Sequence, residues 1–476
     1  MNGRTFSPRR GASAASRLDR LPRSRWLTSV LGVLFLGWLV ESYDIGLTGS
    51  VLPSLTHLYH LSTGTKSLVA TAATIGIVIG IVPAGILADR WGRKRVLVGG
   101  TAAYAILSVL TGLAPDIDTI IVLRLLAGLA MGAVFPLPYA YGSELCPPGL
   151  RGRFTGIADS FLSIGYFASP MLAAFLIPTV TNTTGWRVMF FLGGIPLVFA
   201  ALAWRVLPES PRWYESKGRL EEAESVLREI EERVERELGR PLPPPPPARE
   251  DLAPAATKVP LRTLLRPAYL RRSLVLWITF GGTFLVFYAI QTFMPTVVHQ
   301  MGFTLTSSFV FTAVIVAVSI PGKLLEAVLV ERWGRKPVII SFGLVAGAAA
   351  LAFGLVHGAT IVLVVGCVMS FFGIGLDPAV KVYTAESYPT ALRATGTATT
   401  EGFGRLLSGI VGPALIPPLL VLGGPLAAFV LVGVVALASI AVVAGFGSET
   451  RGRSLEESAA VAEVPSAPRV AVRHVA

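Results

Sequence analysis

The hexapeptide Asp89-Arg90-Trp91-Gly92-Arg93-Lys94 returns 242 residues later as Glu331-Arg332-Trp333-Gly334-Arg335-Lys336, with one conservative exchange. A second group of residues returns at the same spacing, and its pairs are Tyr141 and Tyr383, Glu144 and Glu386, Pro147 and Pro389, and Arg151 and Arg393. One spacing that holds over so many residues indicates an internal duplication. We therefore predict two homologous halves, at residues 1–206 and 273–446.

The composition places both halves in a membrane. The 476 residues are 53% apolar and only 15% charged, and their mean hydropathy is +0.65, which is too apolar for a soluble globular protein. A bilayer core of about 30 Å requires about 20 apolar residues per helical span. We predict an all-α integral membrane protein with two pseudo-symmetric six-helix bundles. Its twelve transmembrane helices are expected at residues 27–55, 68–88, 96–114, 119–140, 154–179, 187–206, 273–298, 308–330, 337–356, 360–383, 394–420 and 425–446.

The net charge of +12 is explained by membrane topology rather than by nucleic-acid binding, because Lys and Arg accumulate on the cytoplasmic side. The loops after the odd-numbered helices carry only Lys66 and Arg187, whereas seven arginines precede the first helix. We predict a monomeric multi-pass protein of the cell membrane, surrounded by lipid, with both termini in the cytoplasm. The expected order is a basic N-terminus at 1–26, a six-helix bundle at 27–206, a cytoplasmic central loop at 207–272, a second bundle at 273–446 and a cytoplasmic tail at 447–476.

The central loop contains a charged stretch from Glu215 to Arg240, in which apolar residues recur at helical spacing. We predict a cytoplasmic amphipathic helix there, followed by a semi-rigid polyproline spacer at residues 241–247.

Patterns typical of several other protein classes are absent from the sequence. The two cysteines lie in different halves and the five histidines show no metal-ligand spacing, so we predict no metal and no cofactor. There is no ATP-binding Gly-x-x-x-x-Gly-Lys-Ser/Thr loop, and no catalytic set can be assembled at one membrane depth. The energy source is then a gradient, and the two-half repeat favours alternating access over a channel.

The motifs resemble the major facilitator superfamily over nearly the whole chain. The loop Gly85-x-x-x-Asp89-Arg90-x-Gly92-Arg93-Lys94 is similar to that superfamily's signature, and the resemblance implies its twelve-helix fold. Three further segments look like the sugar and metabolite transporter branch. They are Arg124-x-x-x-Gly128-x-x-x-Gly132, Pro208-Glu209-Ser210-Pro211-Arg212-Trp213-Tyr214 and Glu449-Thr450-Arg451-Gly452-Arg453.

Two departures from the sugar porters bear on the substrate. Helix 5 lacks their glutamine motif, and helix 7, which reads FYAIQTFMPTVV, lacks their QQxSG-plus-asparagine pattern. Helix 1 reads Glu41-Ser42-Tyr43-Asp44-Ile45-Gly46, similar to the Glu-x-aromatic-Asp stretch of metabolite-proton symporters. The resemblance therefore favours a small organic acid over a sugar.

Charged residues at the cytoplasmic helix ends recur in both halves, where acids stabilise helix N-termini and arginines pair with them. The charges of Arg95 and Lys94 are explained by membrane topology alone. The other charged residues recur in both halves, which favours a role in gating. The predicted gating residues are Asp89, Arg90, Arg93, Glu144 and Arg151 in the first half and Glu331, Arg332, Arg335, Glu386 and Arg393 in the second.

A charge in the middle of a membrane span costs about 2.5–3.5 kcal/mol, so each one is a functional candidate. Counted along their helices at about 1.5 Å per residue, Asp44 and Arg124 reach similar depths in the outer half. An aspartate beside a guanidinium stays ionised, whereas an unpaired one in a dry cavity takes up a proton. We predict Asp44 as the proton carrier and Arg124 as its switch, with a static ion pair as the alternative. Glu41 lies on the same helical face and would share the proton or bind substrate.

Polar residues of helices 5, 7, 10 and 11 form the predicted substrate site. Arg405 offers an anionic substrate a planar guanidinium that matches a carboxylate; the alternative is that it only pairs with Glu401, one turn away. Lys381 stands at ion-pair spacing from Asp377 on helix 10, as Lys323 does from Glu326 on helix 8. The predicted substrate-binding residues are Asp159, Tyr288, Gln291, Asp377, Glu401 and Arg405.

We interpret the chain as a secondary active transporter for proton-coupled symport of a small organic acid or related metabolite, and not as an enzyme. Its expected partners are a small-molecule substrate, a proton and the lipid bilayer. A sugar or polyol porter, or an uncoupled facilitator, is the first alternative. A non-transporting nutrient sensor with the same fold is the second.

Overall fold

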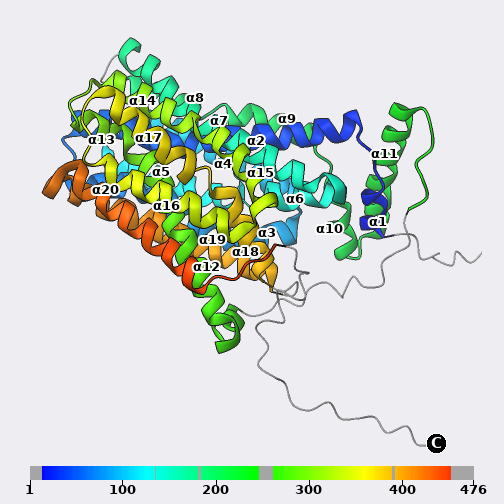
Figure 1. The fold of residues 1–476 in the computed structure, drawn as a ribbon. Helices are drawn as coiled ribbons and strands as arrows, with labels where there is room; N and C mark the ends of the chain where they lie inside the picture. The colour runs from blue at the N-terminus through cyan, green and yellow to red at the C-terminus, as the bar shows by residue number, and fades with distance from the viewer. Residues whose placement is uncertain (1–12, 135, 181–183, 246–260, 389–391, 452–476) are drawn as a thin grey trace, which may run out of the picture.

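The computed structural model of the chain describes residues 13–134, 136–180, 184–245, 261–388 and 392–451, and every regular element in this part is helical. Figure 1 shows a bundle of long helices, with the short helix α1 (Ala14–Asp19) and the helix α11 (Leu220–Leu238) beyond one end. The repeated loops Asp89–Lys94 and Glu331–Lys336 lie at this same end. We call it the signature end below.

The first half makes six passes through the bundle. Pro136 and Pro196 stand at the breaks in the fourth and sixth passes. Pro136 is the N-cap of the helical piece that follows it and Pro196 is the first residue of its piece, positions at which a missing N–H is tolerated. The passes are α2 (Arg25–Tyr59), α3 (Thr63–Trp91), α4 (Arg93–Leu113), α5 (Ile117–Val134) with α6 (Leu137–Leu145), α7 (Pro148–Val180), and α8 (Gly185–Leu192) with α9 (Pro196–Val206).

The second half repeats this arrangement, with wider π-helical turns in its seventh and eleventh passes. It opens with the 3-10 turn η1 (Leu261–Leu265). The passes are α12 (Pro267–Tyr288), η2 (Ala289–Phe293) and α13 (Met294–Gln300); α14 (Leu305–Ala317) and α15 (Ser319–Trp333); α16 (Arg335–Phe353); α17 (Ala359–Gly373) and α18 (Asp377–Ser387); and α19 (Arg393–Leu406) and η3 (Leu407–Val411), which lead into α20 (Gly412–Phe446).

The continuous element α20 contains the twelfth pass. By length and apolar composition the described residues hold eleven candidate spans, and the last, Thr395–Phe446, has 52 residues. At about 1.5 Å per residue it is roughly 78 Å long, more than twice the ~30 Å of a bilayer core. The backbone is non-helical at Gly423 and Gly424, where Figure 1 shows the chain turning back. The prediction of twelve transmembrane helices in two bundles is therefore confirmed.

Several helices extend beyond their predicted limits. α2 begins two residues early, at Arg25, and α7 begins six residues early, at Pro148. Apolar windows mark only the bilayer core, whereas the helices continue into polar turns that carry their own caps. The Ser24 hydroxyl, for example, accepts the N–H of Leu27 and so caps α2.

Small residues bring α5 close to α3. A Cβ atom at Gly128 would lie 2.0 Å from the carbonyl oxygen of Ala73, and one at Gly132 would lie 2.6 Å from the carbonyl carbon of Gly80. No side chain fits at either position. The glycines of the Arg124-x-x-x-Gly128-x-x-x-Gly132 motif therefore fix the position of α5, which carries Arg124 one turn before Gly128.

The predicted helix between the halves is present but shorter than Glu215–Arg240. The chain first forms α10 (Pro211–Ser216), turns at Gly218 with a φ of 71°, and then forms α11, which ends at Gly239 with a φ of 66°. Glycine adopts these left-handed angles at no steric cost, so it divides the stretch. The end of the polyproline run lies outside the described residues.

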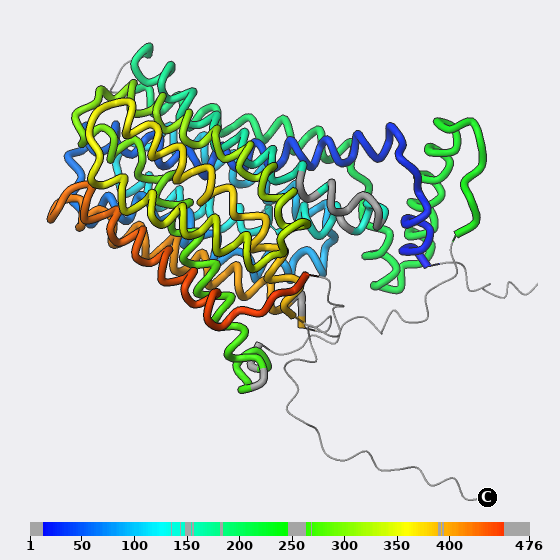
Figure 2. Tube along the Cα trace, viewed as in Figure 1, coloured from blue at the N-terminus to red at the C-terminus, as the bar shows by residue number. Residues whose placement is uncertain are grey.

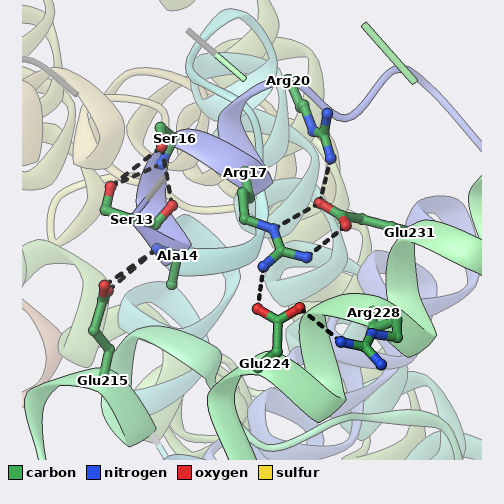
Figure 3. Close-up of polar contacts among 9 residues, drawn as sticks. All are labelled: Ser13, Ala14, Ser16, Arg17, Arg20, Glu215, Glu224, Arg228 and Glu231. Carbon is green, nitrogen blue, oxygen red and sulfur yellow. Dashed lines mark hydrogen bonds and ion pairs between the residues drawn. The ribbon is translucent and has the colours of Figure 1, made fainter. Parts of the chain in front are cut away.

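The basic segment before the first pass forms α1, which arginine–glutamate pairs hold against α11 (Figure 3). Arg17 contacts Glu224 and places its Nη2 2.6 Å from Glu231 Oε2, while Arg20 Nη2 lies 2.6 Å from Glu231 Oε1. Figure 2 shows α1 and α11 side by side at the signature end. This helix was not predicted from the sequence.

We expect acid to release α1 from α11. Burial raises the pKa of the Glu231 carboxyl, but hydrogen bonds from Arg17 and Arg20 outweigh burial, and the pKa is lowered overall. The stabilisation is therefore complete above the unfolded-state pKa of about 4.3 and is lost as the pH falls through the folded-state pKa. Amide hydrogen exchange in α1, corrected for its intrinsic pH dependence, should accelerate in that range.

At neutral pH, Glu231→Gln should accelerate the same amide exchange by roughly fivefold, because losing partly exposed ion pairs destabilises the contact between α1 and α11 by about 1 kcal/mol. The exposed Glu221→Gln on α11 is the matched control. Wild-type protection of α1 in Glu231→Gln would contradict the assignment.

Candidate functional site

A charge network occupies the signature end of the first half. Arg93 Nη1 lies 3.0 Å from Asp89 Oδ1, and Arg93 Nε lies 3.4 Å from Glu144 Oε1. Glu209, after the sixth pass, accepts the N–H groups of Arg93 and Lys94 at 2.8 and 3.1 Å. These N–H groups belong to the first turn of α4 and have no partner within that helix. The network thus ties the second, third and fourth passes to the segment after the sixth.

The second half repeats the network with the same chemistry. Arg335 Nη2 lies 3.2 Å from Glu331 Oε1 and 2.9 Å from Glu386 Oε1. Glu449, after the twelfth pass, accepts the N–H groups of Arg335 and Lys336 at 3.0 and 2.9 Å. These predicted gating residues therefore meet within each half, and their gating role stays a prediction.

Glu209 and Glu449 were not predicted as network members, although the sequence contains a signal for them. Each precedes a hydroxyl residue, Ser210 or Thr450, which donates to the glutamate of its own network. The two Glu-hydroxyl pairs are 240 residues apart rather than 242, so a search at one fixed spacing passes over them.

Two predicted gating residues, Arg90 and Arg332, do not join the networks among the described residues. The side chains of Arg90 and Arg332 are exposed, and Arg451 Nη1 donates to the main-chain oxygen of Arg332. The side chains of Arg151 and Arg393 lie outside the described part of the structure.

Asp44 and Arg124 form an ion pair sealed from solvent, with exposed fractions of 0% and 1%. Arg124 Nη1 lies 2.9 Å from Asp44 Oδ2 and 3.1 Å from Oδ1. Arg124 Nη2 also donates to Thr48 Oγ1 at 3.3 Å, and the Ser108 hydroxyl donates to Asp44 Oδ1 at 3.1 Å. The carboxylate accepts three hydrogen bonds, two from Arg124 Nη1 and one from Ser108, and such charge-assisted bonds favour its ionised form. The two residues thus meet as their predicted depths require.

Glu41 is fully buried, and neither of its carboxyl oxygens has a hydrogen-bond partner among the described residues. The charges acting on it come from Arg405 and Glu401 of the second half and from Asp44. An ionised carboxylate buried without partners is costly. The position suits a neutral acid, separate from the Asp44 ion pair, at the junction of the halves.

A cluster of lysines and aspartates connects the halves. Lys381 Nζ on α18 lies 3.3 Å from Asp159 Oδ1 on α7 and 2.9 Å from Asp377 Oδ2. Lys323 Nζ on α15 lies 3.9 Å from Asp377 Oδ2 and donates to the main-chain oxygen of Asp159 at 3.4 Å. The Asp377–Lys381 pair is confirmed. The expected Lys323–Glu326 pair is wrong, because acceptors on two other helices engage Lys323.

A small cavity lies between the halves beside this cluster. Arg405 faces it and pairs with Glu401, Nη2 to Oε1, at 3.0 Å, while Arg405 Nη1 donates to the Tyr288 hydroxyl at 3.4 Å. Both sequence interpretations of Arg405 are therefore compatible with its position. The lining combines four aromatic rings with two cations: Ile45, Leu162, Tyr166, Phe284, Phe287, Tyr288, Asp377, Lys381 and Arg405.

Gln291 contributes to contact between the halves. A Cβ atom at Gly49 would lie 2.2 Å from the main-chain oxygen of Gln291, and one at Gly46 would lie 2.7 Å from its Nε2. Gln291 sits in the wider turn η2, so it packs on α2, whereas Tyr288 contacts Arg405. Gly49 lies 24 residues, or about 36 Å, along α2. The first and seventh passes therefore close together at the end opposite the signature end.

We expect Gly49→Ala to hold this opposite end open. The new methyl would overlap a main-chain oxygen, and overpacking of this kind costs about 1–3 kcal/mol, so the closed population should fall by about tenfold or more. Labelling of a Thr292→Cys thiol, in protein without Cys146 and Cys367, would report the opening. Gly32→Ala on the same helix is the control, because no atom lies within 4 Å of its added methyl. Equal labelling in both variants would refute the closure contact.

The sequence of the chain matches a known family of transporters. Residues 30–462 match the family described as "Sugar (and other) transporter". The niacin transporter NiaP of Acinetobacter baylyi is 30% identical over 444 residues, which cover 93% of this chain and 98% of the relative. The gallate transporter of Pseudomonas putida is 28% identical over 428 residues, which cover 89% and 92%.

Among solved structures, the inward-open xylose transporter XylE of Escherichia coli superposes with a TM-score of 0.72. The match covers 91% of this chain and 99% of that protein at 20% identity, so it is a likeness of fold. Fold, repeat, loop signature and family match agree. The chain belongs to the sugar and metabolite transporter family of the major facilitator superfamily, and is a multi-pass membrane transporter rather than an enzyme.

Proposed function

We propose that the protein carries a small organic acid together with protons across the cell membrane by alternating access. The Asp44–Arg124 pair carries this proposal. Beside the guanidinium the carboxylate is stabilised as an anion, and in a dry site without it the same group takes up a proton. A rearrangement that separates the pair therefore loads a proton. The signature end is proposed to face the cytoplasm, because Lys and Arg are concentrated there.

For the substrate we propose an aromatic monocarboxylate. The cavity has room for about one water molecule in this structure, so the halves must move apart to admit a substrate. Its aromatic rings would then cover a planar apolar face, and the guanidinium of Arg405 would receive the carboxylate. The positive charges of Lys381 and Arg405 are balanced by the negative charges of Asp377 and Glu401 beside the cavity. A substrate carboxylate that binds together with one proton therefore leaves the site neutral. The names of relatives support this class: a niacin transporter, a gallate transporter and a 4-hydroxybenzoate transporter.

Uptake into proteoliposomes with an alkaline interior tests the proposal. We expect accumulation of at least one acid among nicotinate, gallate and 4-hydroxybenzoate, beyond that in protein-free vesicles, which corrects for passive entry of the neutral acids. Acid uptake that ends at equal concentrations after this correction would instead identify a facilitator. Binding of an acid without flux would identify a sensor.

A sugar or polyol porter remains the second candidate, because an arabinose-proton symporter of Bacillus subtilis is 27% identical over 436 residues. Arabinose and xylose belong in the same uptake panel for this reason. Their pH-driven accumulation, without that of the acids, would favour the sugar porter.

A further inference from the structure

Glu326 on α15 is a buried acid that the transport scheme above does not use. Its side chain is 1% exposed, and its Oε2 atom is buried without a hydrogen-bond partner among the described residues. Five residues later on the same helix, Glu331 shows the ordinary arrangement, with a side chain that is 73% exposed and paired with Arg335. Glu326 therefore needs an explanation that a surface carboxylate does not.

The charges around Glu326 are already balanced without it. Asp377 on α18, Asp159 on α7, Lys323 on its own helix and Arg335 on α16 act on this carboxyl group, and Lys381 joins the same cluster. The two lysines are engaged by the two aspartates, and Arg335 is engaged by its own network. An ionised Glu326 would add one unpaired buried charge, at a cost of several kcal/mol. In this arrangement Glu326 is a neutral acid that holds a proton.

We propose that Glu326 is a second proton-carrying residue, which releases its proton when the halves separate at the signature end. The inference rests on the proposed symport. In this structure Lys323 bridges the halves by donating to the main-chain oxygen of Asp159 on α7. Separation of α15 from α7 breaks that bond and admits water. The O–H of Glu326 then gives its proton to water, and the carboxylate formed pairs with Lys323, three residues away on the same helical face.

The two proton sites lie in different halves and at different depths. Asp44 is 19 residues, or about 28 Å, from the first residue of α2 at the signature end. Glu326 is seven residues, or about 10 Å, from the last residue of α15 at that end. In both, a cation on the protein takes the place of the departing proton: Arg124 at the first site and Lys323 at the second. In this scheme Glu326 takes up its proton from the opposite side of the membrane while the signature end is closed, so that two protons move with each substrate.

The substrate gradient at zero net flux measures the number of protons. With the membrane potential held at zero, a pH difference of one unit balances about a tenfold gradient for one proton and about a hundredfold gradient for two. We call this gradient at zero net flux, for a pH difference of one unit, the balance. Using the acid identified in the uptake panel, we expect a hundredfold balance in the wild type and a tenfold balance in Glu326→Gln. The exposed Asp118→Asn, which makes the same acid-to-amide change, should keep the hundredfold balance.

The balance is an equilibrium quantity, so it does not depend on how much of a variant folds or how fast it works. A tenfold balance in the wild type, or a hundredfold one in Glu326→Gln, would overturn the second site and leave the symport proposal standing. A wild type that balances at equal concentrations would overturn both. If Glu326→Gln does not fold at all, Glu326→Met, which also removes the acid, takes its place, and a tenfold balance in the wild type still overturns the second site.

Discussion

Replacing Asp44 by asparagine is expected to lower the substrate gradient that one pH unit sustains by about tenfold, the equivalent of one proton. Asparagine keeps the size and a hydrogen-bond acceptor toward Arg124 but binds no proton. The variant would therefore change conformation without loading at this site. Exchange of labelled for unlabelled substrate, which requires no net proton movement, should continue. The measurements are the zero-flux balance and the exchange rate in the same vesicles.

Stability and coupling can be separated in this experiment. Asp44→Asn leaves Arg124 as an unpaired buried charge, and breaking a buried pair on one side costs about 3–5 kcal/mol, so thermal stability should fall. The double variant Asp44→Asn/Arg124→Gln removes both charges and should recover part of that loss while its balance stays lowered. An unchanged balance in Asp44→Asn would show that the pair is static, as the alternative interpretation holds.

Asp44 and Glu326 together set the limit of coupling. With Asp44 neutral, the carboxyl of Glu326 still loads and releases one proton, and the balance should remain near tenfold. The variant Asp44→Asn/Glu326→Gln should reach only equal concentrations when Glu41, which is also buried without partners, keeps its proton throughout the cycle, and accumulation that persists in this variant would assign a coupled proton to Glu41. This comparison distinguishes two independent proton sites from one shared site, in which either single variant would abolish accumulation.

The fold and the Asp44–Arg124 pair could be predicted from the sequence for one physical reason. A membrane helix rises by a fixed distance per residue, so position along the chain converts to depth. Charges within the spans are few because each is costly, so two at one depth are natural partners. The repeat at a spacing of 242 residues likewise identified Arg93 and Arg335 together with their acidic partners.

Contacts between helices could not be predicted by the same argument, since depth says nothing about which helix lies beside which. The Lys381–Asp159 bridge joins residues 222 positions apart, and Lys323 joins the same cluster instead of pairing with Glu326 on its own helix. Gln291 was predicted to bind substrate together with Tyr288, but regular helical spacing does not reveal the wider turn η2 that separates their contacts. The unpaired state of Glu326 follows only from these lateral contacts.

Arg405→Lys is expected to weaken binding of a carboxylate substrate by about 10- to 100-fold. Arg405 is 3% exposed and faces the aromatic cavity, where its planar guanidinium can hold both oxygens of a carboxylate. Lysine keeps the positive charge but loses that fork, and a hydrogen bond to a charged group contributes about 1.5–3 kcal/mol. Binding of the acid and of its uncharged amide, nicotinate and nicotinamide for example, should be compared by equilibrium titration of purified protein. Only the acid should weaken.

Glu401 decides whether Arg405 serves the substrate or only its neighbour. The Glu401 carboxylate already occupies one side of the guanidinium, with Nη2 and Oε1 3.0 Å apart, and it competes with a substrate carboxylate for the same donors. Glu401→Gln should therefore tighten acid binding and leave amide binding unchanged, opposite in sign to Arg405→Lys. If both variants weaken acid and amide equally, the pair supports the fold alone and another group binds the substrate carboxylate. Because the affinities for acid and amide are ratios measured on folded protein, a loss of stability in either variant cannot imitate the expected result.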